Sequence, residues 1–367
     1  MLKLDCRYFY GDKPCVYNKT KGIVCDGCYH YSPIKMKILI VKLDAIGDVL
    51  RTTSILKPLK KEYPDCYIEW CTKKNASDLF KNNSLVDEVI TIEDDAFFRI
   101  KTEKYDQVIN LDTSKISSSI AAIANAKTKI GFVLNERGFV ESTSEAANVW
   151  LEMSAFDDFK KANTKSYQQI MYEIIGLDLP AEKPLIDIPE KIKNKIAKID
   201  FVKKIIHEKL TIGLNVGVGT RWQSKGWPLK NWQELIEKLD NNKFNILLLG
   251  GLEEVESIKL LSAKFKKAIN TDCNNSLLEF TAIVDLCDLV ITADTLALHI
   301  ATALDKKIVA LFGPTSANEI ELYGKGIKLT PSFECKCYYK KNCSEEISCM
   351  ESISPESVLK EIEKILQ

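Results

Sequence analysis

The chain has 367 residues, which is too long for a single small core and suits two domains of ordinary size. Its 51 Lys and Arg residues balance 51 Asp and Glu residues, so no net field argues for a nucleic-acid partner. No apolar run reaches membrane-spanning length and the first residues contain no apolar signal segment, so we expect a cytoplasmic protein without a transmembrane segment.

Residues 1–35 are polar and rich in turn residues, and such a segment cannot bury a core of its own. Four of the 12 cysteines lie here, at Cys6, Cys15, Cys25 and Cys28. One C-x2-C pair with two further cysteines suits a tetrahedral four-thiolate site, so we predict a structural zinc or iron ion, with an iron–sulfur cluster as an alternative. Packed or reactive thiols are the competing interpretation. His30 is either a spare ligand or a solvated side chain.

From residue 36 onward, apolar strands alternate with helices. The expected strands are 36–43, 66–71, 86–92, 105–112 and 129–133. The expected helices are 47–63, 75–82 and 114–126. Pro58 should kink the first of these helices. This alternation predicts an α/β fold with a parallel, doubly wound sheet.

A helix over 166–177 leads into a proline-containing linker over 178–191, after which the alternation restarts. The second set of expected strands is 210–217, 244–251, 268–270, 289–294 and 307–313. The helices between and after them are 229–240, one from 253, 276–284, 297–303 and 355–367. We therefore predict two doubly wound domains that face a cleft, over 36–180 and 181–352, with the cysteine-rich extension 1–35 before them and a terminal helix over 353–367 after them.

Asp48 follows the first strand of the first domain, in the stretch VKLDAIGDVLRTTSIL. Ligands of doubly wound sheets bind beyond the carboxyl ends of the strands, so this carboxylate should face the cleft. It is either a helix N-terminal carboxylate, stabilised by the helix dipole, or a general base that takes a proton from an attacking hydroxyl.

Three elements of the second domain also follow strands. The stretch GTRWQSKGWP offers Thr220 and Lys225 to phosphate oxygens, and Glu254 follows a Gly-Gly turn where a carboxylate could hold a ribose. The third stretch contains Asp294, Thr295 and His299, at the start of a helix whose amides could bind a diphosphate. Each has a structural alternative: a solvated lysine, a helix cap or a histidine satisfied within its helix.

Together these stretches resemble glycosyltransferase family 9, the heptosyltransferases. The resemblance rests on ILIVKLDAIGDVLRTTSIL, NVGVGTRWQSKGWPLKNW and LVITADTLALHIATALDKKIVALFGPT, followed by a cysteine run, and it covers about residues 36–367. It implies a GT-B fold of two Rossmann-like domains, with an acceptor domain over 36–180 and a nucleotide-sugar domain over 181–352. Leu296 stands where many members carry a glycine, and residues 1–35 are an addition to the family pattern.

The resemblance implies an inverting, metal-independent transfer of a sugar, typically heptose from ADP-heptose, to an acceptor hydroxyl. Asp48 matches the catalytic base of the family. The donor-binding residues that the resemblance implies are Thr220 and Lys225 at the phosphates, Glu254 at the ribose, and Asp294 with Thr295 at the diphosphate loop. His299 is a further candidate for donor binding. The chain contains no D-x-D triad, which agrees with a metal-free reaction.

The closing cysteine run consists of Cys335, Cys337, Cys343 and Cys349. It resembles a cysteine-rich segment of many family members, and in the autotransporter branch a cysteine cluster binds iron. We predict a second structural metal site here, with the metal, and its relation to the N-terminal cysteines, left open.

The acceptor implied by the family is the lipopolysaccharide inner core, and a protein acceptor is the runner-up. A glycolipid acceptor would bring the protein to the inner face of the membrane, and an oligomer is also left open. Arg51, Lys57, Lys60 and Lys61 either contact an acidic glycolipid or form a solvated helix face. The alternative from another class is a non-catalytic GT-B binding module with structural metal sites.

Overall fold

The computed structural model describes residues 1–367 except 95, 179 and 181. The predicted linker over 178–191 and the predicted domain boundary at 180 and 181 therefore fall partly outside the described residues. None of the described helices is long and apolar enough to cross a membrane.

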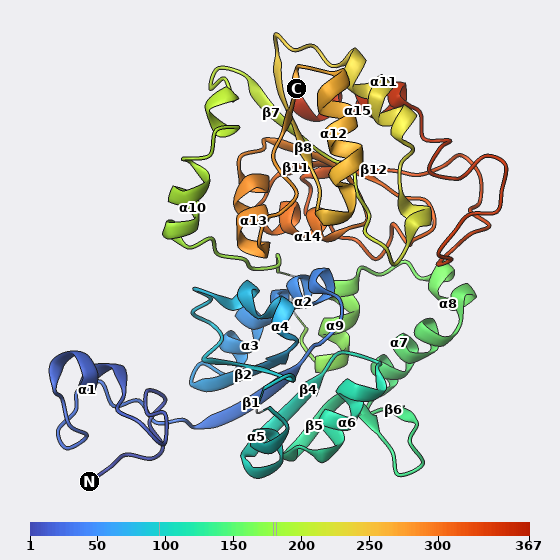
Figure 1. Ribbon diagram of the computed structural model, residues 1–367. Coiled ribbons are helices and arrows are strands. Elements are labelled where there is room, and N and C mark those ends of the chain that lie inside the picture. The colour runs from blue at the N-terminus through green and yellow to red at the C-terminus, as the bar shows by residue number, and fades with distance from the viewer. Residues whose placement is uncertain (95, 179, 181) are drawn as a thin grey trace.

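The first sheet has six strands in the order β3-β2-β1-β4-β5-β6 (Figure 1). At its centre β1 (Met36–Val41) pairs in parallel with β2 (Cys66–Thr72) and β4 (Lys104–Asn110). The outer strands are β3 (Glu88–Thr91), β5 (Asn125–Leu134) and β6 (Val140–Ser142), and β6 runs antiparallel to β5. Helices cover both faces, which explains why β1 is a continuous apolar run rather than an alternating one.

The second sheet has the order β12-β11-β10-β7-β8-β9, with every neighbouring pair parallel. Its strands are β7 (Leu210–Asn215), β8 (Phe244–Leu249), β9 (Ala268–Asn270), β10 (Leu289–Ala293), β11 (Lys307–Leu311) and β12 (Gly326–Leu329). Because its strands are parallel, their carboxyl ends lie along one edge of this sheet, and the parallel strands of the first sheet likewise end along one edge of theirs. The predicted α/β architecture with two doubly wound sheets is confirmed.

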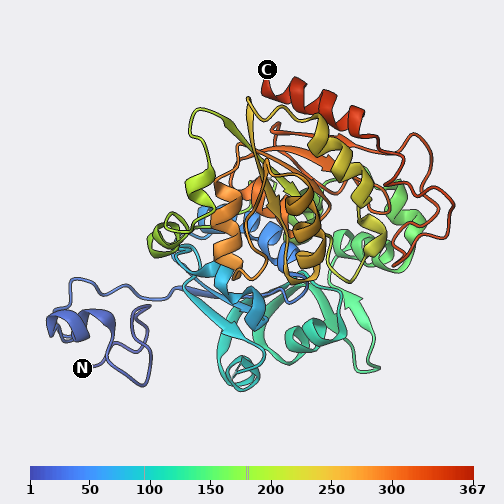
Figure 2. The same ribbon diagram turned by 45° about the horizontal axis from the view of Figure 1, so that its top comes forward.

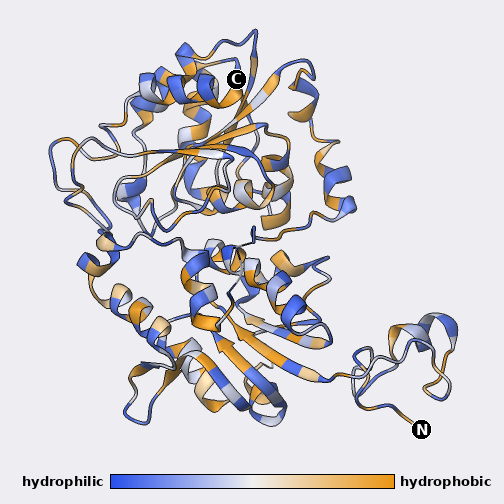
Figure 3. Ribbon diagram, turned by 180° about the vertical axis from the view of Figure 1, so that it is seen from behind, coloured by the Kyte–Doolittle hydropathy of each residue, from blue (hydrophilic) through white to orange (hydrophobic). Residues whose placement is uncertain are grey.

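Helices surround both sheets. Around the first sheet lie α2 (Ile46–Thr52), α3 (Leu56–Glu62), α4 (Lys74–Ser77), α5 (Ala96–Thr102), α6 (Lys115–Ile123), α7 (Glu145–Ala155), α8 (Asp157–Ala162) and α9 (Tyr167–Ile175). Around the second lie α10 (Glu190–Ile196), α11 (Leu229–Lys238), α12 (Val255–Lys264), α13 (Leu277–Asp285), α14 (Leu296–Ala303) and α15 (Pro355–Leu366). Figure 3 shows apolar residues gathered along the strands, whereas the outer helices also present polar residues.

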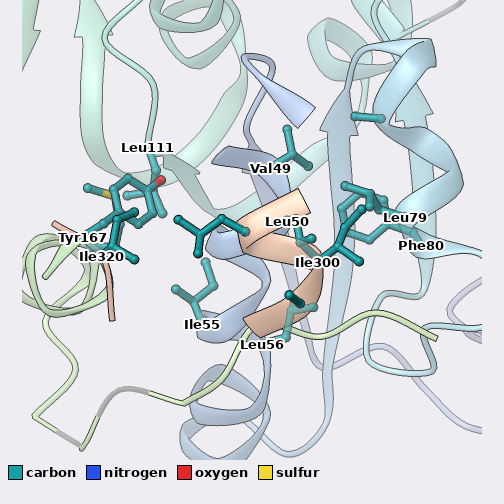
Figure 4. Close-up of a cluster of buried hydrophobic side chains, with 14 of the residues drawn as sticks. Val49, Leu50, Ile55, Leu56, Leu79, Phe80, Leu111, Tyr167, Ile300 and Ile320 are labelled. Carbon is teal, nitrogen blue, oxygen red and sulfur yellow. The ribbon is translucent and has the colours of Figure 1, made fainter. Parts of the chain in front are cut away.

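The two halves share a packed apolar interface. Leu50 of α2 and Ile55 belong to the same buried cluster as Ile300 of α14 and Ile320 (Figure 4). All four side chains are no more than 6% exposed. Burial of this surface holds the carboxyl edges of the two sheets against each other, so residues from both halves can line one site.

The first predicted helix is divided. The structure has α2, a 3-10 turn over Thr53–Ile55 and then α3, where the sequence predicted one helix over 47–63. Thr52 and Thr53 donate their hydroxyls to the carbonyls of Asp48 and Leu50, both at 2.6 Å, and thus stabilise the turn. Pro58 cannot donate to the carbonyl of Ser54, four residues earlier, and this carbonyl accepts from the Tyr172 hydroxyl instead, at 2.8 Å. The interruption over 53–55 therefore agrees with the predicted kink.

Gly47 allows α2 and α14 to approach closely. A Cβ at this position would lie 2.5 Å from Cδ2 of His299, whose buried side chain has little room to move. Gly47→Ala should therefore destabilise the fold by about 1–3 kcal/mol through overpacking. Urea unfolding measures this loss, and Gly251→Ala, whose Cβ would have its nearest neighbour at 3.5 Å, serves as the matched control. Equal stability of the two variants would contradict the packing role.

The N-terminal extension stands apart from the two-sheet body (Figures 1 and 2). It contains a short helix, α1 (Val16–Lys21), and none of its described residues is buried. Arg7 ties it to the body through an ion pair with Asp87, at 3.2 Å. The expectation that residues 1–35 form no apolar core is confirmed.

Candidate active site

A cavity of about 1210 Å³ lies where the carboxyl edges of the two sheets meet. Residues that follow strands of both sheets line it, among them Asp48 and Asp112 from the first half and Gly217, Gly250 and Asp294 from the second. This is the position that doubly wound folds give to their ligands. Six of the seven predicted catalytic and donor-binding residues lie on its wall, namely Asp48, Lys225, Glu254, Asp294, Thr295 and His299.

Asp48 lies in the first turn of α2, with its side chain one-third exposed toward the cavity. Its Oδ1 is 2.8 Å from the guanidinium of Arg51, one turn later on the same helix. Burial would raise the pKa of this carboxyl, but Arg51, followed by Lys42, His299 and Lys160, lowers it to about 2. Asp48 is therefore ionised at neutral pH and able to accept a proton.

A buried ion pair supports the turn before Asp48. Lys42 and Asp112 are 5% and 7% exposed, and the Lys42 ammonium donates to Asp112 and, at 3.0 Å, to the carbonyl of Leu111. Burial opposes the charge of Lys42, but Asp112 outweighs it, so the pKa of the lysine is raised. Asp112 also accepts a hydrogen bond from the backbone N–H of Leu43, at 2.5 Å. The pair fixes the backbone between β1 and α2.

Lys225 approaches the cavity from a 3-10 turn, Gln223–Lys225. Its ammonium donates to the carbonyl of Asp294 at 2.5 Å and lies 3.8 Å from the carboxylate of the same residue. The backbone N–H of Ser224 donates to the carbonyl of Lys341 at 2.9 Å, so the closing cysteine segment holds this turn in place.

Asp294, Thr295 and His299 form the wall at the start of α14. The hydroxyls of Thr295 and Thr292 are 3.0 Å apart, which fixes the turn between β10 and α14. The His299 ring is 9% exposed, with Nε2 at 4.0 Å from Asp294. Burial, followed by the charge of Arg51, lowers the pKa of His299 to about 4, so this ring is neutral at pH 7.

Glu254 closes a glycine turn. Its carboxylate accepts hydrogen bonds from the N–H groups of Gly251, at 2.8 Å, and Gly219, at 3.4 Å. A Cβ on Gly217 would lie 2.0 Å from Cδ of Glu254. Gly217 therefore makes room for this carboxylate.

Thr220 is exposed and is not among the described residues that line the cavity. Its neighbours Arg221 and Trp222 line the cavity instead. The phosphate-binding role of Thr220 stays a prediction that the present arrangement of this loop does not support.

The basic residues of the first helical stretch divide between two environments. Arg51 lines the cavity, whereas Lys60 donates to the carboxylate of Asp87 at 2.9 Å, away from it. Lys57 and Lys61 are exposed. Only Arg51 among these four thus contributes to the described wall of the cavity.

Three residues on the wall were not singled out by the sequence: Lys160, Glu319 and Tyr339. Lys160 belongs to α8, for which no helix was predicted, and its ammonium lies 3.7 Å from the Glu319 carboxylate and 4.2 Å from the centre of the Tyr339 ring. They come from three separate stretches, none of which carries a motif.

The closing cysteines converge. The sulfur atoms of the buried Cys335, Cys337 and Cys349 are 3.2–4.0 Å apart, and Cys343 lines the same cavity of about 410 Å³. The edge of a zinc–thiolate tetrahedron with Zn–S bonds of about 2.3 Å is about 3.8 Å, so the three sulfurs fit a shared metal ion. The predicted convergence of these cysteines is confirmed for these three.

The N-terminal cysteines are each partly buried. Among the described residues, three potential metal ligands lie within 4.8 Å of one another only at Cys335, Cys337 and Cys349. The described sulfur atoms of Cys6, Cys15, Cys25 and Cys28 are therefore not gathered into a metal-binding group. His30 is not solvated: its ring stacks on Tyr17 with centroids 3.6 Å apart, and its buried Nε2 has no hydrogen-bond partner among the described residues.

The pKa values of Asp48 and His299 predict how a reaction in this cavity depends on pH. Asp48 has a pKa of about 2, against an ordinary 3.8, and is ionised throughout roughly pH 5 to 8. His299 has a pKa of about 4 and is neutral over the same range. Neither should contribute a limb to the profile of kcat/KM in this range. Since the pKa of Asp48 is lowered by folding, its stabilising contribution is present above about pH 4 and is lost as the pH falls toward 2. An acidic limb near pH 6 that disappears in His299→Asn would contradict this assignment.

The chain is similar to proteins of known families. The model of a family described as Glycosyltransferase family 9 (heptosyltransferase) matches residues 96–349. Lipooligosaccharide heptosyltransferase 2 of Haemophilus influenzae is 24% identical over 308 residues, which cover 77% of this chain and 84% of that protein.

Two solved structures share the fold. The family 9 glycosyl transferase from Veillonella parvula matches with a TM-score of 0.76 at 20% identity, covering 91% of this chain and 98% of that one. The E. coli ADP-heptose lps heptosyltransferase II matches with a TM-score of 0.68 at 19% identity, covering 90% and 98%. The fold is therefore of the GT-B type.

Proposed function

Because the chain belongs to glycosyltransferase family 9, we propose that it moves a heptosyl group from ADP-heptose to an acceptor hydroxyl, with inversion and without a catalytic metal. It is an enzyme of this class, which sets aside the non-catalytic binding module. The proposed reaction and donor are supported by one observation: the ionised Asp48 lies in the same cavity as Lys225, Glu254 and Asp294.

The donor is assigned to the half of the cavity formed by the second sheet. The adenine would lie against the apolar residues Leu277 and Phe280, with the ribose at Glu254. The diphosphate would meet the Lys225 ammonium and the first N–H groups of α14, where positive charge and free donors favour an anion. ADP-heptose is the donor named for the E. coli relative, which supports this choice of nucleotide.

The transfer follows from this placement. The acceptor oxygen bonds to the anomeric carbon as the bond from that carbon to the diphosphate breaks, and the diphosphate keeps the electron pair. Asp48 takes the proton of the acceptor hydroxyl. A carboxylate with a pKa near 2 is a weak base, but the hydroxyl becomes strongly acidic once its oxygen bonds to the anomeric carbon, so a late proton transfer suffices. Lys225 stabilises the charge that develops on the leaving group.

The nucleotide is tested by thermal shift of the purified full-length protein with ADP, UDP, GDP and CMP. Stabilisation by ADP alone is the expected result, because a ligand that binds only the folded state raises the unfolding midpoint. Stabilisation by UDP or GDP instead would contradict ADP-heptose as the donor.

We further propose the lipopolysaccharide inner core as the acceptor, since the Haemophilus relative is named for lipooligosaccharide. A lipid-linked acceptor would bring the protein to the cytoplasmic face of the membrane. A protein acceptor is the outcome to expect if purified inner-core oligosaccharide is not modified.

The closing cysteines, we propose, hold a structural zinc or iron ion with Cys335, Cys337, Cys349 and Cys343 as ligands. Bound there, the ion would cross-link the segment that anchors the Lys225 turn. The four N-terminal cysteines stay a predicted second site.

Metal analysis by mass spectrometry should find metal in the purified protein and about one equivalent less in Cys337→Ser. Cys71→Ser, which alters a buried thiol of β2 far from both cysteine groups in the sequence, is the control and should keep the full content. Equal metal content in the two variants would contradict the site.

A further inference from the structure

One wall of the cavity has a chemistry that the transfer described above does not use. It consists of Glu319, Lys160, Tyr339 and Trp150, which we call the α8 wall. Trp150 and Lys160 belong to the first half of the chain, whereas Glu319 and Tyr339 belong to the second. The wall therefore exists only where the two halves meet.

The Glu319 carboxylate is the unusual member. Its side chain is 4% exposed, yet its Oε1 accepts no hydrogen bond from any residue that the structure describes. The nearest cation, the Lys160 ammonium, is 3.7 Å away, beyond hydrogen-bond distance. Burying a carboxylate without hydrogen-bond donors costs free energy, so a ligand whose hydroxyl groups donate hydrogen bonds to Glu319 would be bound favourably.

The surrounding groups indicate what kind of ligand this is. Glu319 repels phosphates and carboxylates, so an anionic part of a substrate does not suit it. Lys160 can donate to a hydroxyl while Glu319 accepts from one. Tyr339 and Trp150, whose rings lie 4.2 and 5.6 Å from the Lys160 ammonium, offer flat apolar surfaces. Hydroxyl groups on a ring with an apolar face are the features of a neutral sugar.

We propose that the α8 wall is a sugar subsite, in which Glu319 accepts hydrogen bonds from ring hydroxyls and Lys160 donates to the same sugar. The proposal rests on the proposed function, since it places the sugar beside Asp48. Glu319 is close enough to Asp48 and Asp294 for both charges to act on it, in addition to those of Lys160 and Arg51. Two sugars meet at Asp48 during transfer, the transferred one and the acceptor one, and either has this chemistry.

The chain offers a matched control pair. Lys161, the next residue of α8, forms an ion pair of nearly the same length with Glu334, 3.8 Å against 3.7 Å. The side chains of this pair are 36% and 84% exposed. Lys161 is not among the described residues lining the cavity. Lys161→Met and Glu334→Gln therefore remove equivalent charges without touching the α8 wall.

The test measures the affinities of ADP and ADP-heptose by calorimetry, and the KM for heptose-free inner-core oligosaccharide, in the full-length protein. If the wall binds the transferred sugar, Glu319→Gln and Lys160→Met should each weaken ADP-heptose by at least about tenfold and leave ADP unchanged. If it binds the acceptor sugar, the KM of the oligosaccharide should rise by about tenfold instead. The control variants should change neither quantity.

Two results with the variants would overturn the subsite alone. One is that the Glu319 and Lys160 variants change neither quantity, and the other is that they weaken ADP and lower the unfolding midpoint as well, which indicates a purely structural pair. A failure of the proposed function is distinct, because wild-type protein would then bind neither ADP nor ADP-heptose. That result also leaves the wall without a sugar and overturns the subsite too.

Discussion

Asp48→Asn should lower kcat for heptosyl transfer by about 10³-fold, the largest effect expected of any single substitution. The asparagine amide keeps the shape of the carboxylate but cannot accept the proton of the acceptor hydroxyl. Arg51 would lose its ion-pair partner at 2.8 Å but keep its position over the Tyr167 ring, at 3.7 Å. ADP affinity should therefore change little, whereas the unfolding midpoint should fall, because the ion pair that lowers the pKa of Asp48 also stabilises the fold.

A second carboxylate with the same spacing to its cationic partner provides the control for this prediction. Asp78 pairs with Lys81 three residues later, at 2.6 Å, as Asp48 pairs with Arg51, and Asp78 is not among the described residues that line the cavity. Asp78→Asn should leave kcat unchanged. Transfer by Asp48→Asn at more than about one-tenth of the wild-type rate would show that another group accepts the proton.

Lys225→Met should lower kcat by about 10²- to 10³-fold, because the positive charge nearest to the proposed diphosphate position is lost. Its ammonium is held by the Asp294 carbonyl at 2.5 Å, so it is positioned before the donor binds. The affinity for ADP should fall less than kcat, since charge develops on the diphosphate as the bond to the sugar breaks.

Lys230→Met is the matched control for Lys225, because this nearby lysine pairs with Glu351 on the surface, where its side chain is 69% exposed. Single-turnover rates with saturating ADP-heptose separate the chemical step from binding. A Lys225→Met protein with wild-type kcat and only a raised KM would place this lysine in ground-state binding alone.

The parts of the site that the sequence predicted are those that depend on local pattern. Asp48, Glu254 and Asp294 each follow an apolar strand, and the carboxyl ends of parallel strands converge without any need to know the packing of the helices. The same logic correctly predicted the two doubly wound sheets. Thr220 was not placed correctly by this logic, because its loop turns the side chain away from the described wall of the cavity.

The α8 wall could not be predicted in this way. Lys160 and Glu319 are 159 residues apart in the sequence. They meet because the two halves pack against each other through the apolar cluster that contains Leu50 and Ile300. Neither Lys160 nor Glu319 lies in a motif, and α8 is too short for a clear period. The spacing of the N-terminal cysteines likewise indicated a metal site, but the spacing alone does not bring their sulfurs together.

The central claim is that this cavity transfers a heptosyl group from ADP-heptose to a hydroxyl of the lipopolysaccharide inner core. The most direct measurement is mass spectrometry of heptose-free inner-core oligosaccharide after incubation with the full-length protein and ADP-heptose, with ADP release followed in parallel. We expect the acceptor to gain one heptosyl residue for each ADP released, and Asp48→Asn to lower the rates of both by about 10³-fold. An acceptor that stays unmodified while the wild-type protein binds ADP-heptose, or one that Asp48→Asn modifies at the wild-type rate, would contradict the claim.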